Sequence, residues 1–490
     1  MPQVCFFVYL WQIIVYMKTV IIGREQELSI LKKTYSSSRS EFVAVYGRRR
    51  VGKTFLVREF FKNRFSFHCT GLAEGKTKAQ LKNFNIALSN YAQESIPQAD
   101  NWLDAFEQLI VLIESRPERR KVIFLDELPW MDTARSGFIA ALEHFWNDWA
   151  SARKDIVLIV CGSATSWMMD KLIGNKGGLH NRLTNRIWVK PFTLSECESY
   201  FKSRRIKLSR YQVAECYMIM GGIPYYLDYI DRDYSLNENI DRLFFQEGGQ
   251  MRDEFDNLYS ALFKNSQQYE KVVELLSKKG MGLSREELSS VKKGKSGSGM
   301  TTILKNLEKC GFIRSYLSYG QKTRDKLYQL TDPYTLFYFH FIRSGRYNDQ
   351  HFWTNALLSG ELNAWRGYSF EMLCLCHEQQ IKQALGISGV MTSVSSWRSK
   401  VIEPGKRGAQ IDLLIDHKDG YINLCEMKFS KKEYSIDRKD KEDLENKIEA
   451  FQSETKTRQT VLLTMVTTFG VKANAYSDIV QKTVVLDDLF

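Results

Sequence analysis

The stretch VAVYGRRRVGKTFLVREFF, residues 43–61, constrains the fold more than any other part of the chain. Gly47 and Gly52 bracket four residues and are followed by Lys53 and Thr54, which gives the spacing G-x-x-x-x-G-K-[ST] after an apolar run and before a helical pattern. Backbone N–H groups of such a loop surround phosphate oxygens, and the helix that follows adds the positive end of its dipole. The stretch predicts a phosphate-binding loop, and the alternative is a chance match in an ordinary strand-turn-helix unit.

The side chains of this loop predict ATP with Mg²⁺ as the ligand. Lys53 is expected to neutralise the β- and γ-phosphates, and the Thr54 hydroxyl is expected to hold Mg²⁺. Arg48, Arg49 and Arg50 occupy the variable positions of the loop. They either pair with acids elsewhere or carry solvated charge, and the sequence does not decide between these interpretations.

A second motif, KVIFLDELPW at residues 121–130, is an apolar strand that ends in Asp126 and Glu127. Acids at the end of a buried strand need partners for their charge. Asp126 is expected to hold Mg²⁺ through water, and Glu127 to orient or deprotonate the attacking water. The alternative is that both acids open a loop and cap a helix. A further apolar run at residues 155–167 ends near Ser163 and is predicted to lie between the other two strands, where the hydroxyl could sense the γ-phosphate.

Length and composition limit the architecture. The chain has 490 residues, of which 44% are hydrophobic and only 8 are prolines, so we expect about three domains that are globular throughout. The nine cysteines are scattered and none forms a C-x-x-C pair. This usage is typical of reduced core residues in a cytoplasmic protein and argues against a zinc site.

Residues 1–17, MPQVCFFVYLWQIIVYM, are strongly apolar and carry no charge. They fall short of the roughly 20 residues that a membrane-spanning helix needs. They also lack the basic region and the small-residue cleavage site of a signal peptide. We therefore expect no stable membrane insertion and interpret the segment as an extension before a natural start at Met17. A peripheral membrane anchor is the alternative.

Residues 265–330 hold thirteen Lys and Arg against six Asp and Glu, which is more than half of the chain's net charge of +12. The pattern predicts a helix over QYEKVVELLSKK, a short helix capped by Ser284, a third helix over MTTILKNLEKCGFI and two strands around YGQKT. Three helices followed by a β-hairpin make a winged helix-turn-helix.

The third of these helices is the expected nucleic-acid contact. Leu304 and Leu307 are predicted to face the core, which leaves Thr301, Lys305 and Lys309 to meet phosphates or base edges. Affinity for DNA should then fall strongly with salt. Winged helices also serve as rigid lids that report nucleotide state to a neighbouring domain, and this alternative stays open.

The last 150 residues contain a second group of acids with a lysine. RGYSFEMLC places Glu371 on a helix, GAQIDLLIDHKDG places Asp412 on a strand, and YINLCEMKFS places Glu426 and Lys428 on one face of the next strand. Asp412 and Glu426 could share a divalent ion, and Lys428 could position a water or stabilise developing negative charge. The alternative is a hairpin with charges on its wet face, although YINLC is apolar enough for a central strand.

These motifs together resemble the archaeal-type P-loop ATPases of the STAND-like, AAA+-related branch that carry a C-terminal restriction-endonuclease-like domain. The resemblance covers nearly everything from about Lys18 to the C-terminus. Its marks are IIGREQEL, YGRRRVGKT, FLDELPW, GSATSWM, LHNRLTNRIWVKPF, GGIPYYL, TDPYTLFYFHF and SFE…QID…EMKF.

The resemblance implies an α/β fold with four domains. Residues 18–200 would form the P-loop ATPase core of the ASCE/AAA+-like type with a parallel sheet, and residues 201–264 a helical lid. Residues 265–332 would form the winged helix-turn-helix, and residues 333–490 an α/β restriction-endonuclease-like domain.

The resemblance also implies roles at the nucleotide site that spacing does not give. Gly23 and Arg24 look like the segment that lies against the nucleotide base. Arg182 matches the arginine that would approach the γ-phosphate, in cis or from a neighbouring subunit of a homo-oligomer, and Arg186 is the competing candidate. The Gly-Gly-Ile-Pro break in the helical pattern is either a helix stop or, as the resemblance implies, an element whose Pro224 touches adenine.

In the C-terminal region, Glu371, Asp412, Glu426 and Lys428 fall on the PD-(D/E)XK nuclease pattern in sequence order. The first three would be ligands of Mg²⁺ or Mn²⁺, and Glu426 and Lys428 would be catalytic. Phe429 stands where a Trp often follows the lysine of this pattern.

We therefore expect a cytoplasmic, ATP-hydrolysing switch that couples nucleotide state to DNA binding and to metal-dependent DNA cleavage. The alternatives are a nucleotide-gated regulator that binds a partner through an inactive nuclease-like domain, and a transcription factor that reads specific bases. The sequence does not distinguish DNA from RNA or a monomer from a ring.

Overall fold

The computed structural model describes residues 21–174, 177–263, 265–290, 297–321, 325–343, 345, 349–399 and 408–490. The prediction for residues 1–17 lies outside them. The chain divides into two compact units, with the boundary between Lys190 and Pro191. No helix within the described ranges is both long and apolar enough to cross a membrane.

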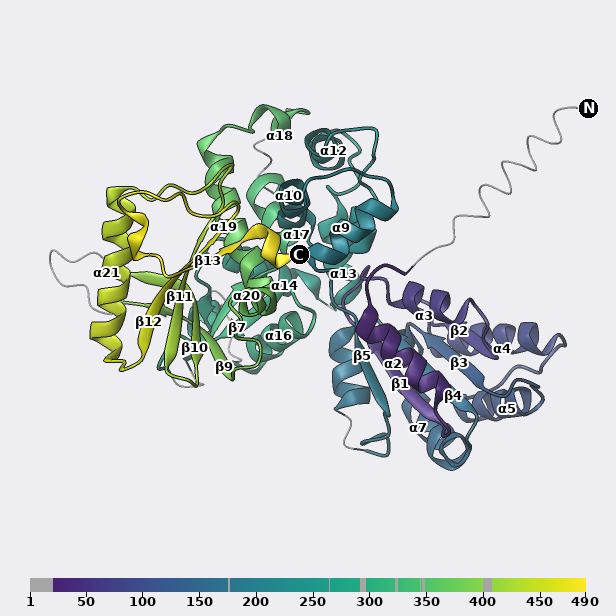
Figure 1. Ribbon diagram of the computed structural model, residues 1–490. Coiled ribbons are helices and arrows are strands. Elements are labelled where there is room, and N and C mark those ends of the chain that lie inside the picture. Colours follow the sequence, from purple (N-terminus) through teal and green to yellow (C-terminus); the bar gives the residue numbers. More distant parts are fainter. Residues whose placement is uncertain are drawn as a thin grey trace, which may run out of the picture. The chain divides into compact units, whose positions relative to one another are not determined.

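The first unit alternates helices with the strands of one sheet (Figure 1). Its elements are α2 Glu25–Ser36, β1 Glu41–Tyr46, α3 Lys53–Phe61, β2 Phe67–Thr70, α4 Thr77–Ala92, α5 Trp102–Glu114, β3 Lys121–Asp126, α6 Leu128–Met131, α7 Phe138–His144, β4 Ile156–Gly162, α8 Thr165–Trp167 and β5 Asn185–Trp188. All strand pairs are parallel, in the order β2-β3-β4-β1-β5. The prediction that the strand before Ser163 lies between the other two is confirmed, because β4 separates β3 from β1.

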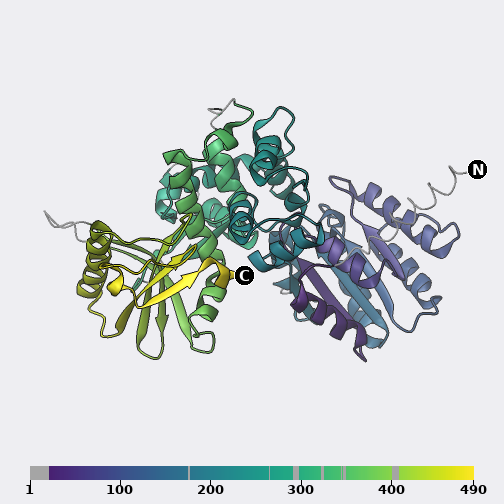
Figure 2. The same ribbon diagram turned by 45° about the horizontal axis from the view of Figure 1, so that its top comes forward.

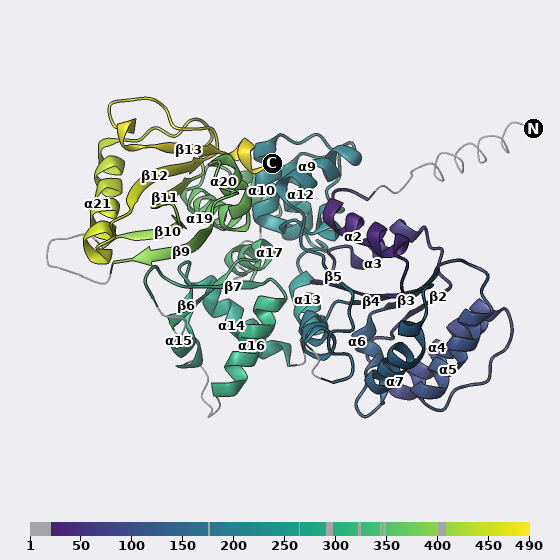
Figure 3. The same ribbon diagram turned by 60° about the horizontal axis from the view of Figure 1, so that its bottom comes forward.

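Apolar strands and amphipathic helices build the core of this unit. Helices α2 and α3 lie on one side of the sheet and α4, α5 and α7 on the other (Figure 3). Phe42 and Ala44 of β1 pack into the same cluster as Phe84 of α4 and Leu109 of α5. Burial of β3 and β4 along their whole length is what a parallel sheet covered on both faces requires.

The second unit begins with helices and a small sheet. These elements are α9 Leu194–Ser203, α10 Arg210–Met220, α11 Pro224–Leu227, α12 Leu236–Ile240, α13 Glu254–Leu262, α14 Ser266–Ser277, β6 Leu283–Ser284, α15 Arg285–Ser290, α16 Gly297–Lys309, β7 Ile313–Tyr316 and β8 Leu327–Leu330. Strands β6, β8 and β7 form a three-stranded antiparallel sheet.

Local signals account for the elements of residues 266–330. The Ser284 hydroxyl accepts from the Glu287 N–H at 3.2 Å and the Glu287 carboxylate accepts from the Ser284 N–H at 2.7 Å, which is the capping box that starts α15. Leu304 and Leu307 of α16 are buried, as predicted. The three predicted helices and the two strands after them are present, whereas the short strand β6 between α14 and α15 was not predicted.

The rest of the second unit contains a five-stranded sheet. Its elements are α17 Pro333–Phe337, α18 Phe352–Asn355, α19 Gly360–Cys376, α20 Glu378–Ala384, β9 Thr392–Arg398, β10 Gln410–His417, β11 Tyr421–Lys428, α21 Arg438–Thr455, β12 Thr460–Thr467 and β13 Lys482–Val485. The order is β13-β12-β11-β10-β9, so YINLC does lie in the central strand. Helices α19 and α21 lie on opposite faces of this sheet (Figures 1 and 2).

Helix α10 joins the helical region to the C-terminal sheet. It is buried along most of its length and contacts α17 and α19. Glu215 of α10 pairs with Arg366 of α19 at 2.8 Å. The Tyr211 ring stacks on Phe429, the residue after Lys428, with centroids 4.9 Å apart. The helix that leads into Gly-Gly-Ile-Pro is therefore packed against the elements that carry the C-terminal acids.

Candidate functional site

The loop between β1 and α3 has the backbone that its glycines predict. Gly47 has φ of 149°, and a Cβ there would lie 2.2 Å from the Val189 carbonyl oxygen. Gly52 has φ of 88°, in the left-handed region that favours glycine. Helix α3 begins at Lys53, as the sequence predicts. Both glycines are thus required by conformation or by close approach.

Lys53 lies inside the loop rather than in solvent. Its side chain is 5% exposed, and Nζ donates to the Arg48 carbonyl oxygen at 2.9 Å and to the Ser163 Oγ at 3.3 Å. The amine therefore lies between the loop and the end of β4. Arg48 is itself only 4% exposed, so the interpretation of solvated charge does not hold for that arginine.

Thr54 and Asp126 face each other across the start of α3 and the end of β3. The Thr54 hydroxyl lies 3.1 Å from Oδ1 and 3.0 Å from Oδ2 of Asp126. Asp126 is 3% exposed. A hydroxyl and a carboxylate are oxygen ligands that suit Mg²⁺, so this pair fits the ion that the motif implies.

Glu127 is held by the end of the neighbouring strand. Its φ of 46° turns the chain after β3. Its Oε2 accepts from the Ser163 N–H at 3.1 Å, and its Oε1 accepts a short bond from the Ser163 hydroxyl. Because Lys53 also donates to that hydroxyl, Ser163 links the loop lysine to the second acid.

Gly23 and Arg24 precede α2 and contact the loop. Gly23 has φ of 61°. Arg24 is buried, and its guanidinium donates to the Val51 carbonyl oxygen at 3.1 Å and to the Lys190 carbonyl oxygen at 2.7 Å. Arg24 thus fixes the N-terminal segment beside the loop, which leaves its predicted role at the nucleotide base a prediction.

The remaining predicted residues of the nucleotide site are Arg182, Arg186 and Pro224. Arg182 is exposed, and its Nε donates to the Gly178 carbonyl oxygen at 3.5 Å. Arg186 lies exposed on β5, where its charge opposes the rise that burial causes in the pKa of Tyr46. Pro224 is the first residue of α11 in the second unit. These positions do not choose between Arg182 and Arg186.

In the second unit, one cavity of about 470 Å³ brings together the C-terminal residues. Its lining includes Glu371 of α19, Asp412 of β10, Glu426 and Lys428 of β11, and Lys447 of α21. The antiparallel pairing of Leu413 with Cys425 continues toward Asp412 and Glu426, which places these two acids on neighbouring strands at the same level.

Cations and an amide bind the two strand acids. Lys428 lies 3.0 Å from Glu426 Oε1, and the Lys447 Nζ donates to Glu426 Oε2 at 2.6 Å. The Gln410 amide donates to Asp412 Oδ1 at 2.6 Å. Glu426 therefore has an ammonium group on each oxygen.

The electrostatics of the three acids differ accordingly. Burial, with repulsion from Asp412 and Glu426, raises the pKa of Glu371 to about 8. Burial also raises the pKa of Asp412. Burial alone would raise the pKa of Glu426, but Lys447 and Lys428 lower it below the usual value. One acid of the pocket is thus kept ionised by lysines and another is kept protonated by its surroundings.

The residue types of the pocket suit a divalent ion. Their positions in this structure do not form a complete set of ligands. Three carboxylates are the hard oxygen donors that Mg²⁺ or Mn²⁺ takes. Within the part of the chain that the structure describes, however, no three His, Cys, Asp or Glu side chains are grouped closely enough to hold a metal ion. The lysines that hold Glu426 would have to give up at least one oxygen.

Comparison with known proteins shows what the first part of the chain is similar to. Residues 21–230 match the model of a family described as an ATPase domain predominantly from Archaea. These residues thus resemble an archaeal-type ATPase domain, and we call them the ATPase domain. The loop from Gly47 to Thr54, Asp126, Glu127 and Ser163 all lie inside this ATPase domain.

The chain is also similar to uncharacterized proteins and to solved ATPases. The protein MJECL04 of Methanocaldococcus jannaschii is 26% identical over 66% of this chain and 69% of that protein. The uncharacterized ATP-binding protein MJ0423 of the same organism is 36% identical over 45 residues, which are 9% of this chain and 76% of that protein. The Walker-type ATPase PABY2304 of Pyrococcus abyssi matches with TM-score 0.48 and 18% identity, over 66% of this chain and 96% of that chain. The ORC2 protein of Aeropyrum pernix, in ADPNP-ADP complexes, matches with TM-score 0.42 and 14% identity, over 67% and 96%.

The sequence analysis did not name Lys447 and Gln410, which bond to the strand acids of the C-terminal pocket. Lys447 lies on α21 among several other lysines and acids, and Gln410 is the first residue of β10. Only the position of α21 over the sheet singles out Lys447, and no spacing in the sequence gives that position. In the first unit, by contrast, Ser163 contacts both Lys53 and Glu127, and the sequence analysis had named Ser163.

Proposed function

We propose that this chain is an ATP-hydrolysing switch whose nucleotide state controls binding of DNA by the second unit. The observation that carries the proposal is the joint arrangement of Lys53, Thr54, Asp126, Glu127 and Ser163 at the carboxyl ends of adjacent strands of the ATPase domain.

Each of these residues has one step to perform. Lys53 neutralises charge on the β- and γ-phosphates, and the loop N–H groups bind their oxygens. Thr54 and Asp126 would hold Mg²⁺, which supplies further neutralisation of the phosphate charge. Glu127 accepts a proton from the attacking water. Ser163 donates to Glu127 and holds its carboxylate until a γ-phosphate competes for the same hydroxyl and for Lys53.

The DNA-binding element is the winged helix-turn-helix that we assign to residues 265–332. Support comes from the basic excess of that segment and from α16, on which Thr301 and Lys305 are exposed. Exposed lysines on a helix of such a module contact phosphates, which gives affinity without strict sequence readout.

Coupling between nucleotide and the second unit runs through α10 in this proposal. Pro224, which follows α10, is the residue proposed to touch adenine. The contacts of Glu215 with Arg366 and of Tyr211 with Phe429 connect the same helix to α19 and β11. A shift of α10 would therefore move the strand that carries Glu426 and Lys428, so the C-terminal pocket is proposed to be a nucleotide-controlled, metal-dependent nuclease site.

A second candidate function is favoured by one observation in that pocket. Both oxygens of Glu426 are held by lysines, and no closely grouped set of three ligands is found among the described residues. This arrangement supports a regulator in which the nuclease-like domain is inactive and binding to a partner is the output.

Two experiments test these proposals. In the first, ATP hydrolysis by Lys53→Ala is expected to be lost while the fold, followed by circular dichroism, is kept; normal turnover would refute the site.

In the second, circular and linear DNA are incubated with Mg²⁺ or Mn²⁺, with and without ATP, beside a Glu426→Ala/Lys428→Ala variant. Cleavage that is absent in the variant locates the nuclease site, and no cleavage by a protein that hydrolyses ATP selects the regulator.

A further inference from the structure

The edge of the ATPase sheet opposite the nucleotide loop is strongly basic. Four loops enter the amino ends of β1 to β4, at residues 37–40, 62–66, 115–120 and 153–155. These eighteen residues include eight Lys and Arg and two Asp and Glu. Because the strands are parallel, all four loops lie at one edge of the sheet. We call these loops the amino edge.

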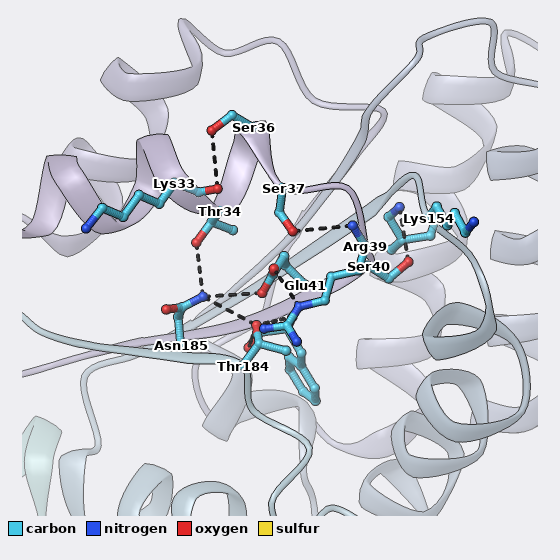
Figure 4. A network of polar contacts seen from close by, with 12 residues as sticks. Lys33, Thr34, Ser36, Ser37, Arg39, Ser40, Glu41, Lys154, Thr184 and Asn185 are labelled. Carbon is cyan, nitrogen blue, oxygen red and sulfur yellow. Dashed lines mark hydrogen bonds and ion pairs between the residues drawn. The ribbon is translucent and has the colours of Figure 1, made fainter.

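Two acids near the amino edge are already paired with cations. Asp155 accepts from Arg153 at 2.8 Å and from Lys121 at 2.9 Å. Glu41, the buried first residue of β1, accepts from Arg39 at 3.2 Å and from Asn185 at 3.3 Å, as Figure 4 shows. Among the described residues, Asp155 and Glu41 are thus bonded to other cations, and neither acid forms an ion pair with Arg64 or Arg119.

A cavity of about 540 Å³ opens at the amino edge. It is lined by Arg64, Arg119 and Arg120, by the rings of Tyr35 and Phe65, and by the serines at 36, 37 and 66. Glu118 is the one acid in the lining. The cavity thus combines positive charge, hydroxyl groups and aromatic faces.

Two of these arginines differ from the third in what they contact. Arg120 has a structural role. Its guanidinium donates to the carbonyl oxygens of Thr34, Arg39 and Lys154 and so connects three segments of the chain. Arg64 and Arg119 are exposed, and within the described ranges neither forms an ion pair. The bonds of Arg120 hold the loops that surround the cavity. Arg64 and Arg119 are available to an anionic ligand.

The aromatic residues give the cavity a second property. Tyr35 is 45% exposed and packs edge-on against Phe61, with centroids 5.6 Å apart. Phe65 is half-buried and packs against Phe124 at 5.3 Å. Both rings are therefore held in place by the core while part of their surface faces outward. Fixed aromatic rings beside arginines are the elements on which single-stranded bases stack.

We propose that the amino edge binds a single strand of nucleic acid. Arg64 and Arg119 contact its phosphates, and a base enters the cavity against Tyr35 and Phe65. A single strand fits better than a duplex, because the bases of a duplex are stacked on each other and cannot enter a cavity. This site lies in a different unit from the winged helix-turn-helix, so the chain would hold a strand independently of Lys305 and Lys309.

The test measures binding of a labelled oligothymidylate of about 16 nucleotides, the upper end of common site sizes, by fluorescence anisotropy with the full chain. The variant is Arg64→Ala/Arg119→Ala. The matched control is Lys78→Ala/Lys82→Ala, which removes two exposed charges from α4 of the same unit. All proteins carry Lys305→Ala/Lys309→Ala, so that failure of the winged-helix assignment cannot affect the result.

The variant is expected to bind about tenfold more weakly, and its slope of log affinity against log salt is expected to fall by about 1.4, since each phosphate contact on a single strand contributes about 0.7. Tyr35→Ala should weaken binding about fivefold or more without changing the slope. The control should bind as its parent does, and all proteins should keep the same ATP affinity.

Three results would overturn the proposal. The arginine variant could bind the oligonucleotide with unchanged affinity and slope. A duplex of the same length could lose as much affinity as the single strand. Polyglutamate could displace the oligonucleotide at equal charge while Tyr35→Ala has no effect, which would make the amino edge a docking surface for an acidic protein.

Discussion

The proposed nucleotide site and the C-terminal pocket both contain Asp, Glu and Lys. The two sites differ in the groups that bond to the acids. In the ATPase domain, Asp126 is bonded to the hydroxyl of Thr54, and Glu127 to the hydroxyl and N–H of Ser163. In the pocket, Glu426 is bonded to the ammonium groups of Lys428 and Lys447. Neutral donors hold both carboxylates of the first site, whereas full positive charges hold Glu426 in the pocket.

The difference bears on what each site is ready to do. A carboxylate held by hydroxyl and N–H groups keeps its negative charge for a cation or a proton. A carboxylate between two lysines has that charge already balanced, and a divalent ion must displace an ammonium group to reach it. The acids of the first unit are thus bonded to neutral groups only, whereas a divalent ion in the pocket would have to displace a lysine from Glu426.

The largest effect is expected from Glu127→Gln in the ATPase domain. The amide cannot accept a proton from water, so ATP hydrolysis should fall about 100-fold or more while ATP affinity changes little. Phosphate release and nucleotide binding measure the two quantities. Glu107→Gln, an exposed acid on α5, is the matched control and should behave as the parent protein does. Hydrolysis at the parental rate in Glu127→Gln would remove the proposed base.

A smaller effect is expected from Lys447→Met in the pocket. Removing one ammonium group frees Glu426 Oε2, so Mn²⁺ should bind about tenfold more tightly, equivalent to about 1.4 kcal/mol. Titration calorimetry in the absence of DNA measures the affinity. Lys439→Met removes an exposed lysine from the same helix and should leave it unchanged. Weaker Mn²⁺ binding in Lys447→Met would mean that Lys447 supports the ligands instead of competing with the ion.

The smallest effect is expected from Glu371→Gln, and it depends on pH. The pKa of Glu371 is raised from 4.5 to about 8, first by burial. Below 4.5 the carboxyl is protonated in the folded and unfolded chains alike. Between 4.5 and about 8 only the folded chain keeps the proton, so its stabilising contribution is lost as pH rises through this window.

Glu371→Gln lacks this titration. With a chelator present, its melting temperature relative to the parent should therefore rise by several degrees between pH 5 and pH 8.5, as about 1 kcal/mol or more would give. Thermal unfolding followed by circular dichroism measures the difference. A difference that is constant with pH would show that Glu371 titrates at its ordinary value.

The sequence predicted the elements around Lys53 and Asp126 because these residues belong to short, contiguous motifs. The loop from Gly47 to Thr54 carries its own geometry, and Asp126 and Glu127 follow an apolar strand whose place in a parallel sheet is constrained. The position of β4 between β3 and β1 also followed from the pattern.

The pocket was only partly predictable because its residues come from separate elements. Alternation along β11 placed Glu426 and Lys428 on one face, and the pocket does contain both. The pattern could not place Lys447, because α21 is rich in charge on several faces. The amino edge was not predicted either, since its basic residues belong to four loops that only the parallel sheet brings together.

We propose above that the nucleotide state of the chain controls its binding of DNA. The most direct test is the affinity of the full chain for labelled duplex DNA with no nucleotide, with ADP and with a non-hydrolysable ATP analogue, at one fixed salt concentration. We predict that affinity differs between the ADP and analogue states by about fivefold or more in the parent, the range of typical coupling energies, and that Lys53→Ala shows no such difference. Equal affinity in all three states, in a protein that binds both ATP and DNA, would contradict the account.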